Sequence, residues 1–137
     1  MTTTFVRNYF MNPKISPAEW EVLNVVWNRA PVTAADVYEV LSSETDWHPK
    51  TVNTFLARLA EKGIVAIRRE GKANIYTPLL TREQCIGHES ESFLQRVFRG
   101  ATGPLLAHFC ERADLSDAEI ARLQKLLQQR TKKGRKK

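Results

Sequence analysis

The strongest constraint on how this chain can fold is the order of local signals over residues 16–78, which begins with two well-marked helix starts. Ser16-Pro17-Ala18-Glu19 is a capping box with proline at the first helical position, and Pro31 ends the helix that it begins. Thr33, three residues before Asp36, caps a second helix. The apolar stripes of these helices consist of Trp20, Leu23, Val26, Trp27 and Ala30, and of Val37, Tyr38, Val40 and Leu41.

A third helix and a β-hairpin follow in the sequence. Pro49 begins the helix, and Gly63 stands where a C-terminal cap belongs. Residues 64–69 favour a β-strand, residues 70–74 resemble a turn, and residues 75–77 resume the strand. Three short helices alone enclose little hydrophobic core, so a further element must cover their apolar faces. A helix-turn-helix followed by a hairpin is the order of a winged helix, and the order alone leaves a generic small α+β domain as the alternative.

The third helix has two distinct faces. At 100° per residue, its core face consists of Val52, Phe55, Leu56 and Leu59. Its outer face consists of Lys50, Thr54, Ala57 and Glu61, with Asn53 and Arg58 on the flanks. This short polar face with a small residue at its centre is suited to a DNA major groove. Lys50 and Thr51 lie in the first turn, where backbone N–H groups and the helix dipole favour a phosphate. The alternative is a solvated helix face, which usually carries more paired charge.

Length and composition set the broad class. The chain has 137 residues, enough for one domain of ordinary size or two small ones, and 42% of them are hydrophobic, as in a folded protein. No apolar run approaches the roughly 18 residues of a membrane span. The first 12 residues lack the pattern of a signal peptide. Two cysteines are too few for a disulfide scaffold and fit a reduced cytoplasm. We therefore expect a cytoplasmic protein without a membrane partner.

The net charge of +6 is concentrated at one end of the chain. Residues 1–80 contain 9 Lys/Arg and 8 Asp/Glu, and residues 81–129 contain 6 and 7, so these two parts nearly balance. Residues 130–137 contain 6 basic residues and no acidic ones. The basic pI therefore results from this tail. Evidence for nucleic-acid binding by the folded part must come from the arrangement of its residues, because its net charge is close to zero.

Residues 81–129 are predicted to form a dimerisation unit of three helices. Thr81 and Ser116 begin capping patterns, residues 100–103 break the helical pattern, and Pro104 begins the middle helix. The apolar residues expected to hold a dimer together are Phe93, Val97, Leu105, Phe109, Ile120, Leu123 and Leu127. Three amphipathic helices expose more apolar surface than they can cover, so a second subunit is the natural cover. The alternative is a monomer in which they fold back on the N-terminal domain.

Metal binding and catalysis receive less support. Cys85 and His88 share a helix face, and His108 and Cys110 lie near each other, so a metal-responsive protein using these four residues is an alternative. Buried free cysteine is the commoner outcome, so we expect no metal site and no cofactor. The sequence contains no Gly-rich phosphate loop, no His-Glu-x-x-His motif and no recognisable carboxylate pair, so we expect no enzyme and no catalytic residues.

Three segments carry a resemblance to a known family. Residues 15–23, 47–59 and 61–63 resemble the BlaI/MecI/CopY (penicillinase repressor) family of bacterial winged-helix regulators. The likeness continues through residues 91–93 and 114–116, so that it spans about residues 15–129. The combination of Pro-Lys-Thr with Thr-x-x-x-Arg-Leu is specific. The resemblance implies a homodimeric repressor bound to palindromic double-stranded operator DNA.

The resemblance also implies which residues meet DNA. In this family the start of the third helix and the wing contact the operator, which corresponds here to Lys50, Thr51, Asn53, Thr54 and Arg58 and to Arg68, Arg69 and Lys72. Antibiotic-resistance members often carry a basic residue at the position of Asn53, so this chain departs from their pattern at that residue, and the resemblance does not give the operator sequence. The family's copper-responsive members end in paired Cys-x-Cys motifs, which this chain lacks.

Release from DNA is the last property that the resemblance implies. In resistance members a sensor-linked protease cuts an Asn-Phe bond in the dimerisation region. The corresponding position here is His108-Phe109, where histidine replaces asparagine. We therefore expect a cleavage-sensitive interface that a β-lactam-type sensor does not cut at this bond.

The sequence thus predicts a mainly α protein with a small β-hairpin. Its parts are a winged helix-turn-helix DNA-binding domain at residues 1–80, a helical dimerisation domain at 81–129 and a basic disordered tail at 130–137. The predicted function is sequence-specific transcriptional repression by a homodimer. The alternative from another class is a winged-helix module whose third helix and wing meet a protein.

Overall fold

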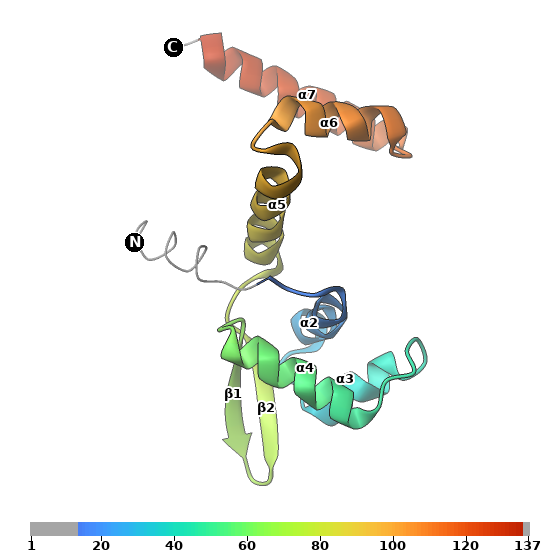
Figure 1. The fold of residues 1–137 in the computed structure, drawn as a ribbon, viewed down its shortest axis with the longest axis vertical. Coiled ribbons are helices and arrows are strands. Elements are labelled where there is room, and N and C mark those ends of the chain that lie inside the picture. The colour runs from blue at the N-terminus through green and yellow to red at the C-terminus, as the bar shows by residue number, and fades with distance from the viewer. Residues whose placement is uncertain (1–13, 136–137) are drawn as a thin grey trace. The chain divides into compact units, whose positions relative to one another are not determined.

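The computed structural model describes residues 14–135 and places them in two compact units, one ending at Ser92 and the other beginning at Phe93 (Figure 1). The elements in chain order are α2 (Pro17–Arg29), α3 (Ala34–Leu41), α4 (Pro49–Glu61), β1 (Val65–Glu70), β2 (Ala73–Pro78), α5 (Arg82–Phe98), α6 (Thr102–Arg112) and α7 (Asp117–Arg135). The mainly helical fold with one hairpin confirms the predicted fold class.

The helix starts read from the sequence are present in atomic detail. Ser16 Oγ accepts from the Glu19 N–H at 3.2 Å, and the Glu19 carboxylate accepts from the Ser16 N–H at 2.8 Å. Thr33 and Asp36 form the same reciprocal pair at the start of α3, at 3.1 and 3.0 Å. Each box satisfies two N–H groups that a helix end leaves open, which is why both helices begin where predicted.

The hairpin is tighter than the predicted five-residue turn. Strands β1 and β2 pair antiparallel out to Glu70 and Ala73, which leaves Gly71 and Lys72 as a two-residue turn. Gly71 has φ of +63°, the left-handed conformation that such a turn requires at its first position. Val32 adds a bridge to Tyr76 through a pair of backbone hydrogen bonds at 3.2 and 2.7 Å, so the hairpin is tied to the segment between α2 and α3.

The core of the N-terminal unit joins all its elements. Its buried side chains are Ile15, Val22, Leu23, Val25, Val26, Val32, Val37, Leu41, Val52, Leu56, Leu59, Ile64, Val65, Tyr76 and Cys85. The predicted core face of α4 is confirmed at Val52, Leu56 and Leu59, each 0% exposed. Phe55 is the exception, because its half-buried ring lies against Trp47 rather than in the centre of the core.

Glu19 is a charged residue within this core. It is 1% exposed, and Lys62 Nζ donates to its Oε1 at 2.6 Å and to the Lys14 carbonyl at 2.8 Å. Burial acts to raise the pKa of Glu19, but the hydrogen bonds from Lys62 and Ser16 outweigh it and leave that pKa below its ordinary value of 4.5. The capping carboxylate thus also links the start of α2 to the end of α4.

The first half of α5 packs with the N-terminal unit. Cys85 is fully buried there, and the Trp27 indole N–H donates to the Leu80 carbonyl at 2.9 Å. The Arg82 guanidinium lies 5.4 Å from the centre of a Trp27 ring and donates to Asn28 Oδ1 at 3.2 Å. The compact units divide inside α5, after Ser92, whereas the sequence places the end of its predicted winged-helix domain after Leu80.

The C-terminal unit has a different character. Over residues 93–132, the part whose side chains are described, no side chain is buried. Helix α6 begins at Thr102, two residues before Pro104, and Ser116 caps α7 as predicted, with its Oγ accepting from the Glu119 N–H at 3.1 Å.

Helix α7 continues through residues 130–135, the segment for which the sequence predicts a disordered tail. Thr131 donates back to the Leu127 carbonyl at 3.1 Å, within the continuing helix. Lysine and arginine are good helix formers and are favoured near a helix C-terminus, where their charge complements the dipole. Lys136 and Lys137 lie outside the described residues. Among the described residues, none of the helices has the length and apolar character needed to cross a membrane.

Candidate nucleic-acid interface

Helix α4 starts differently from α2 and α3. Its N-cap, His48, makes no side-chain capping hydrogen bond, and its first turn holds no acidic residue. Helices α2 and α3 each begin with a carboxylate folded over the N-terminal N–H groups. The N-terminus of α4 therefore keeps its partial positive charge open, and Lys50 in the same turn adds a full one. This arrangement favours an anion such as a backbone phosphate.

The outer face of α4 is open along its length. Four of the five residues predicted on this helix are exposed, and Thr51 is half-buried; the exposed ones are Lys50, Asn53, Thr54 and Arg58. Thr54 Oγ1 donates to the Lys50 carbonyl at 3.0 Å, one turn earlier. The opposite face of the same helix is in the core, so its position is fixed while its outer side chains remain free to meet a ligand.

An aromatic pair supports Arg58. The Trp47 and Phe55 rings have centroids 5.1 Å apart at 57°, and the Arg58 guanidinium lies 5.9 Å from the Phe55 centroid. An aromatic face attracts a guanidinium, which limits the orientations that Arg58 samples. Phe55 was predicted on the core face, and its contact with Arg58 was not predicted. Its spacing of three residues before Arg58 was the available signal.

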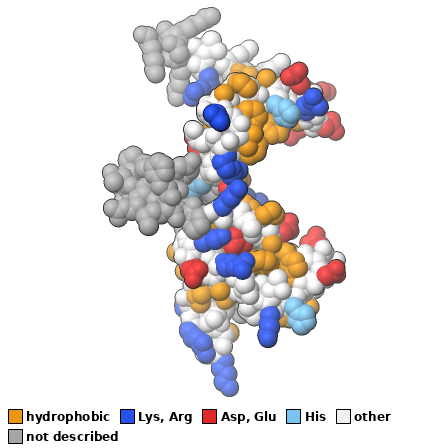
Figure 2. All heavy atoms as spheres, viewed as in Figure 1, with side chains coloured by type: hydrophobic (Ala, Val, Ile, Leu, Met, Phe, Trp, Pro, Cys, Tyr) orange, Lys and Arg blue, Asp and Glu red, His pale blue; other side chains and the backbone are white. Residues whose placement is uncertain are grey.

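The hairpin carries the other predicted cations. Arg68, Arg69 and Lys72 are all exposed, and Figure 2 shows Lys and Arg side chains gathered along the hairpin. Arg68 is paired with Glu70 at 2.8 Å, and Arg69 donates to the Gly71 carbonyl at 3.3 Å. Exposed pairs of this kind are weak, of the order of 0–1 kcal/mol, so a phosphate can replace them. Lys72 lies in the turn itself.

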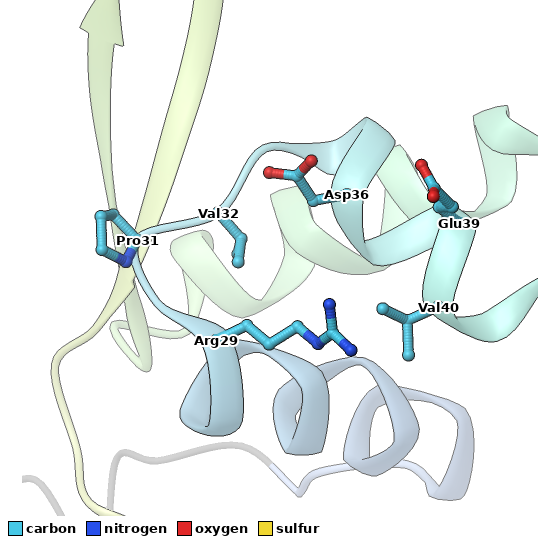
Figure 3. A pocket seen from close by; sticks show the side chains of 6 residues that line it. All are labelled: Arg29, Pro31, Val32, Asp36, Glu39 and Val40. Carbon is cyan, nitrogen blue, oxygen red and sulfur yellow. The ribbon is translucent and has the colours of Figure 1, made fainter.

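A hollow of about 540 Å³ lies elsewhere on this unit, lined by Arg29, Pro31, Val32, Asp36, Glu39 and Val40 (Figure 3). It lies between the end of α2 and helix α3, and its lining includes neither α4 nor the predicted wing cations. One cation and two carboxylates give it mixed charge, which does not suit a polyanion.

The four residues of the metal alternative form no evident site. In the described part of the chain, no group of three or more His, Cys, Asp or Glu residues could hold a metal ion. Burial, with a smaller contribution from the charge of Glu89, raises the pKa of the Cys85 thiol to about 11. A metal ligand must be a thiolate, so this protonated thiol is poorly suited to the role. Cys110 is exposed in the C-terminal unit.

The predicted dimerisation residues remain uncovered within one chain. Phe93, Val97, Phe109, Ile120, Leu123 and Leu127 are exposed, and Leu105 is half-buried. Leu106 and Leu126 are not in the predicted dimerisation set, and they too are exposed, at 48% and 43%. The apolar side chains coloured orange along these helices are visible in Figure 2. His108 and Phe109 are exposed on α6, with ring centroids 5.5 Å apart.

A helix-turn-helix with an uncapped, cationic α4, followed by a cationic hairpin, defines a winged-helix DNA-binding protein. The sequence model of the Penicillinase repressor family matches residues 15–129. The chain therefore belongs to the penicillinase repressor family, whose members are DNA-binding transcriptional repressors and not enzymes.

Individual relatives agree with this assignment. The penicillinase repressor of Bacillus licheniformis is 37% identical over 125 residues, which cover 91% of this chain and 96% of that protein. The methicillin resistance regulatory protein MecI of Staphylococcus aureus is 33% identical over 114 residues, covering 83% and 93%. The solution structure of the DNA binding domain of the repressor BlaI, at 37% identity, covers 53% of this chain and 89% of that domain, with a TM-score of 0.49.

Proposed function

We propose that this chain represses transcription as a homodimer on a palindromic operator, with α4 in the major groove and the hairpin against the flanking backbone. The observation that carries the proposal is the uncapped start of α4, where Lys50 precedes an exposed polar face and no acidic side chain neutralises the first turn. Phosphate contacts there would set the register of the helix, and Asn53, Thr54 and Arg58 would meet base edges.

Dimerisation is supported by the burial pattern of the C-terminal unit. Its three helix segments are amphipathic, yet none of the side chains described over residues 93–132 is buried. A second copy of the chain offers the same apolar faces in a two-fold arrangement, and a palindrome has the matching symmetry. Half-site centres are then expected about one helical turn apart, roughly 10 base pairs, or a small multiple of that spacing.

Fluorescence anisotropy with a labelled operator duplex tests the assignment of α4. Arg58→Ala and Lys50→Ala are each expected to weaken binding by about 1–3 kcal/mol, because each removes a base or close phosphate contact. Arg29→Ala is the matched control, since it removes the same charge from the hollow on the other part of the unit. Wild-type affinity in both α4 variants would exclude this surface as the interface.

Salt dependence separates DNA binding from the alternative of a protein-interaction module. Binding to DNA releases counterions, so the affinity falls steeply as salt rises, with a log–log slope of about −0.9 for each phosphate contacted. We expect this slope to become shallower in the Lys50→Ala variant. A specific protein partner retained at high salt, with no duplex bound at low salt, would support the module instead.

We further propose that proteolysis in α6 releases the repressor. A cut there would separate α7 and its apolar residues from the rest of the unit, and weaker dimerisation lowers operator occupancy. The bond between His108 and Phe109 lies within a helix, which must open before a protease can bind it in extended form. Histidine differs from asparagine in shape and charge, so we expect a β-lactam-type sensor not to cut here. Mass spectrometry after induction would contradict this if it found a fragment ending at His108.

A further inference from the structure

The centre of the outer face of α4 is made of short side chains between two cations. Thr54 lies one turn after Lys50 and one turn before Arg58, and Ala57 follows it by three residues on the same side. All four residues are exposed. Because Thr54 and Ala57 extend little beyond the helix backbone, this part of the face can approach a base edge closely, while the longer cations reach outward around it.

The hydrogen bond of Thr54 limits what this residue can offer to a base. Its hydroxyl donates to the Lys50 carbonyl at 3.0 Å, within the helix. Donation to a base acceptor would break that bond, whereas the methyl group has no such commitment. The C5-methyl of thymine is the base group that makes apolar contact with threonine and alanine methyls in the major groove.

We propose that Thr54 is a specificity-determining residue that selects thymine through contact between its methyl group and the thymine C5-methyl, with Ala57 leaving room for the base. This inference rests on the proposed function, because it requires α4 to lie in the major groove. It adds a base preference and the chemical group that reads it.

Uracil isolates this contact, since it pairs as thymine does and lacks only the C5-methyl. The probe is a duplex recovered by the full chain from a random-sequence pool, remade with each thymine replaced in turn by uracil. We expect one thymine in each half-site at which the replacement weakens wild-type binding about 3- to 5-fold, the effect of one buried methyl group.

Two variants, each lacking one group of the Thr54 side chain, then identify which group reads the base. Thr54→Ser keeps the hydroxyl and loses the methyl, so it should bind the thymine and uracil duplexes equally at that position. Thr54→Val keeps a methyl and loses the hydroxyl, so it should retain the preference for thymine. Melting temperatures check that α4 remains folded in both variants.

The outcomes separate this inference from the proposed function. A selected duplex that binds equally well with uracil at every position overturns the thymine contact and leaves repressor function intact. A preference that survives in Thr54→Ser and is lost in Thr54→Val also overturns it, because the hydroxyl would then be the reading group. Failure to recover any preferred duplex would overturn both.

Discussion

Helices α4 and α7 are both amphipathic, but only α4 buries its apolar stripe within the chain. Its Val52, Leu56 and Leu59 are 0% exposed, whereas Ile120 and Leu123 on α7 are 40% exposed. The N-terminal unit surrounds α4 with two capped helices and a hairpin, while the C-terminal unit leaves its helices uncovered. One unit therefore has a hydrophobic core of its own, and the other leaves apolar surface that the proposed second copy would cover.

The difference also separates two roles. Because the stripe of α4 is fixed in a core, its outer face can present side chains in defined positions to a ligand. The apolar faces of α5 to α7 are better suited to joining two copies, since an isologous interface covers both with the same residues. Because the units divide inside α5, the winged unit includes the first eleven residues of that helix, Arg82–Ser92.

The largest expected effect comes from replacing a leucine by alanine in each of the two apolar stripes. Leu56→Ala should lower the free energy of unfolding of the N-terminal unit by about 2–5 kcal/mol, because it leaves a cavity in a packed core. Leu123→Ala should leave the unfolding of that unit unchanged and raise the dimer dissociation constant. Urea unfolding at two protein concentrations distinguishes these results. Equal loss of stability in both variants would show that α7 packs in the same core.

A smaller effect is expected from the buried ion pair. Lys62→Met should cost about 3 kcal/mol, because it leaves the Glu19 carboxylate buried without its cation. Because the pKa of Glu19 lies below its ordinary value of 4.5, its ionised carboxylate stabilises the wild-type fold at pH values above 4.5. This contribution is lost as the pH falls through the folded-state pKa. Unfolding curves across pH 3–7 should therefore show that acid-dependent loss in wild type and a weaker one in the variant. Glu61→Gln is an exposed control, and identical pH profiles in wild type and Lys62→Met would contradict the account.

The two cysteines report on the two units separately. Cys85 has a pKa raised to about 11 by burial, while Cys110 is exposed. At a pH well below 9, a shift from 9.0 to about 11 lowers the thiolate fraction about 100-fold, so alkylation of Cys85 should be much slower than in the unfolded chain. Mass spectrometry of peptides after timed alkylation measures this. Equally fast labelling of Cys85 in the folded and unfolded chains would show that it lies outside a stable core.

The smallest effect is expected at the basic end of α7. Truncation after Gln129 removes six positive charges and should make the salt dependence of DNA binding shallower, because fewer counterions are released. Preference among operator sequences should stay nearly unchanged, since these residues would contact only the backbone. Lost discrimination between two related duplexes would mean that this segment reads bases.

The sequence predicted local structure well and long-range contacts poorly. The capping boxes at Ser16 and Thr33 and the core face of α4 could be read directly, because their partners lie within four residues of one another. The contacts of Glu19 with Lys62 and of Arg82 with Trp27 join residues far apart in the chain, so no local pattern indicated them.

The candidate interface followed the same rule. The exposed face of α4 was evident from helical periodicity, and the cations of the hairpin stood out as basic residues at the tip of a predicted hairpin. The division of the units after Ser92 was not evident, because it depends on contacts between distant parts of the chain. Helix propensity accounts for the continuation of α7 through residues 130–135, where charge density alone predicted disorder.

The central claim is that the N-terminal unit reads one half-site and the C-terminal helices join two such units. Sedimentation of fragment 1–92 and of the full chain, each with and without a palindromic duplex, tests it most directly. We expect the fragment to be a folded monomer that fills the two half-sites independently and weakly, and the full chain to be a dimer that binds both together. A dimeric fragment, or one that binds the palindrome as tightly as the full chain, would contradict the account.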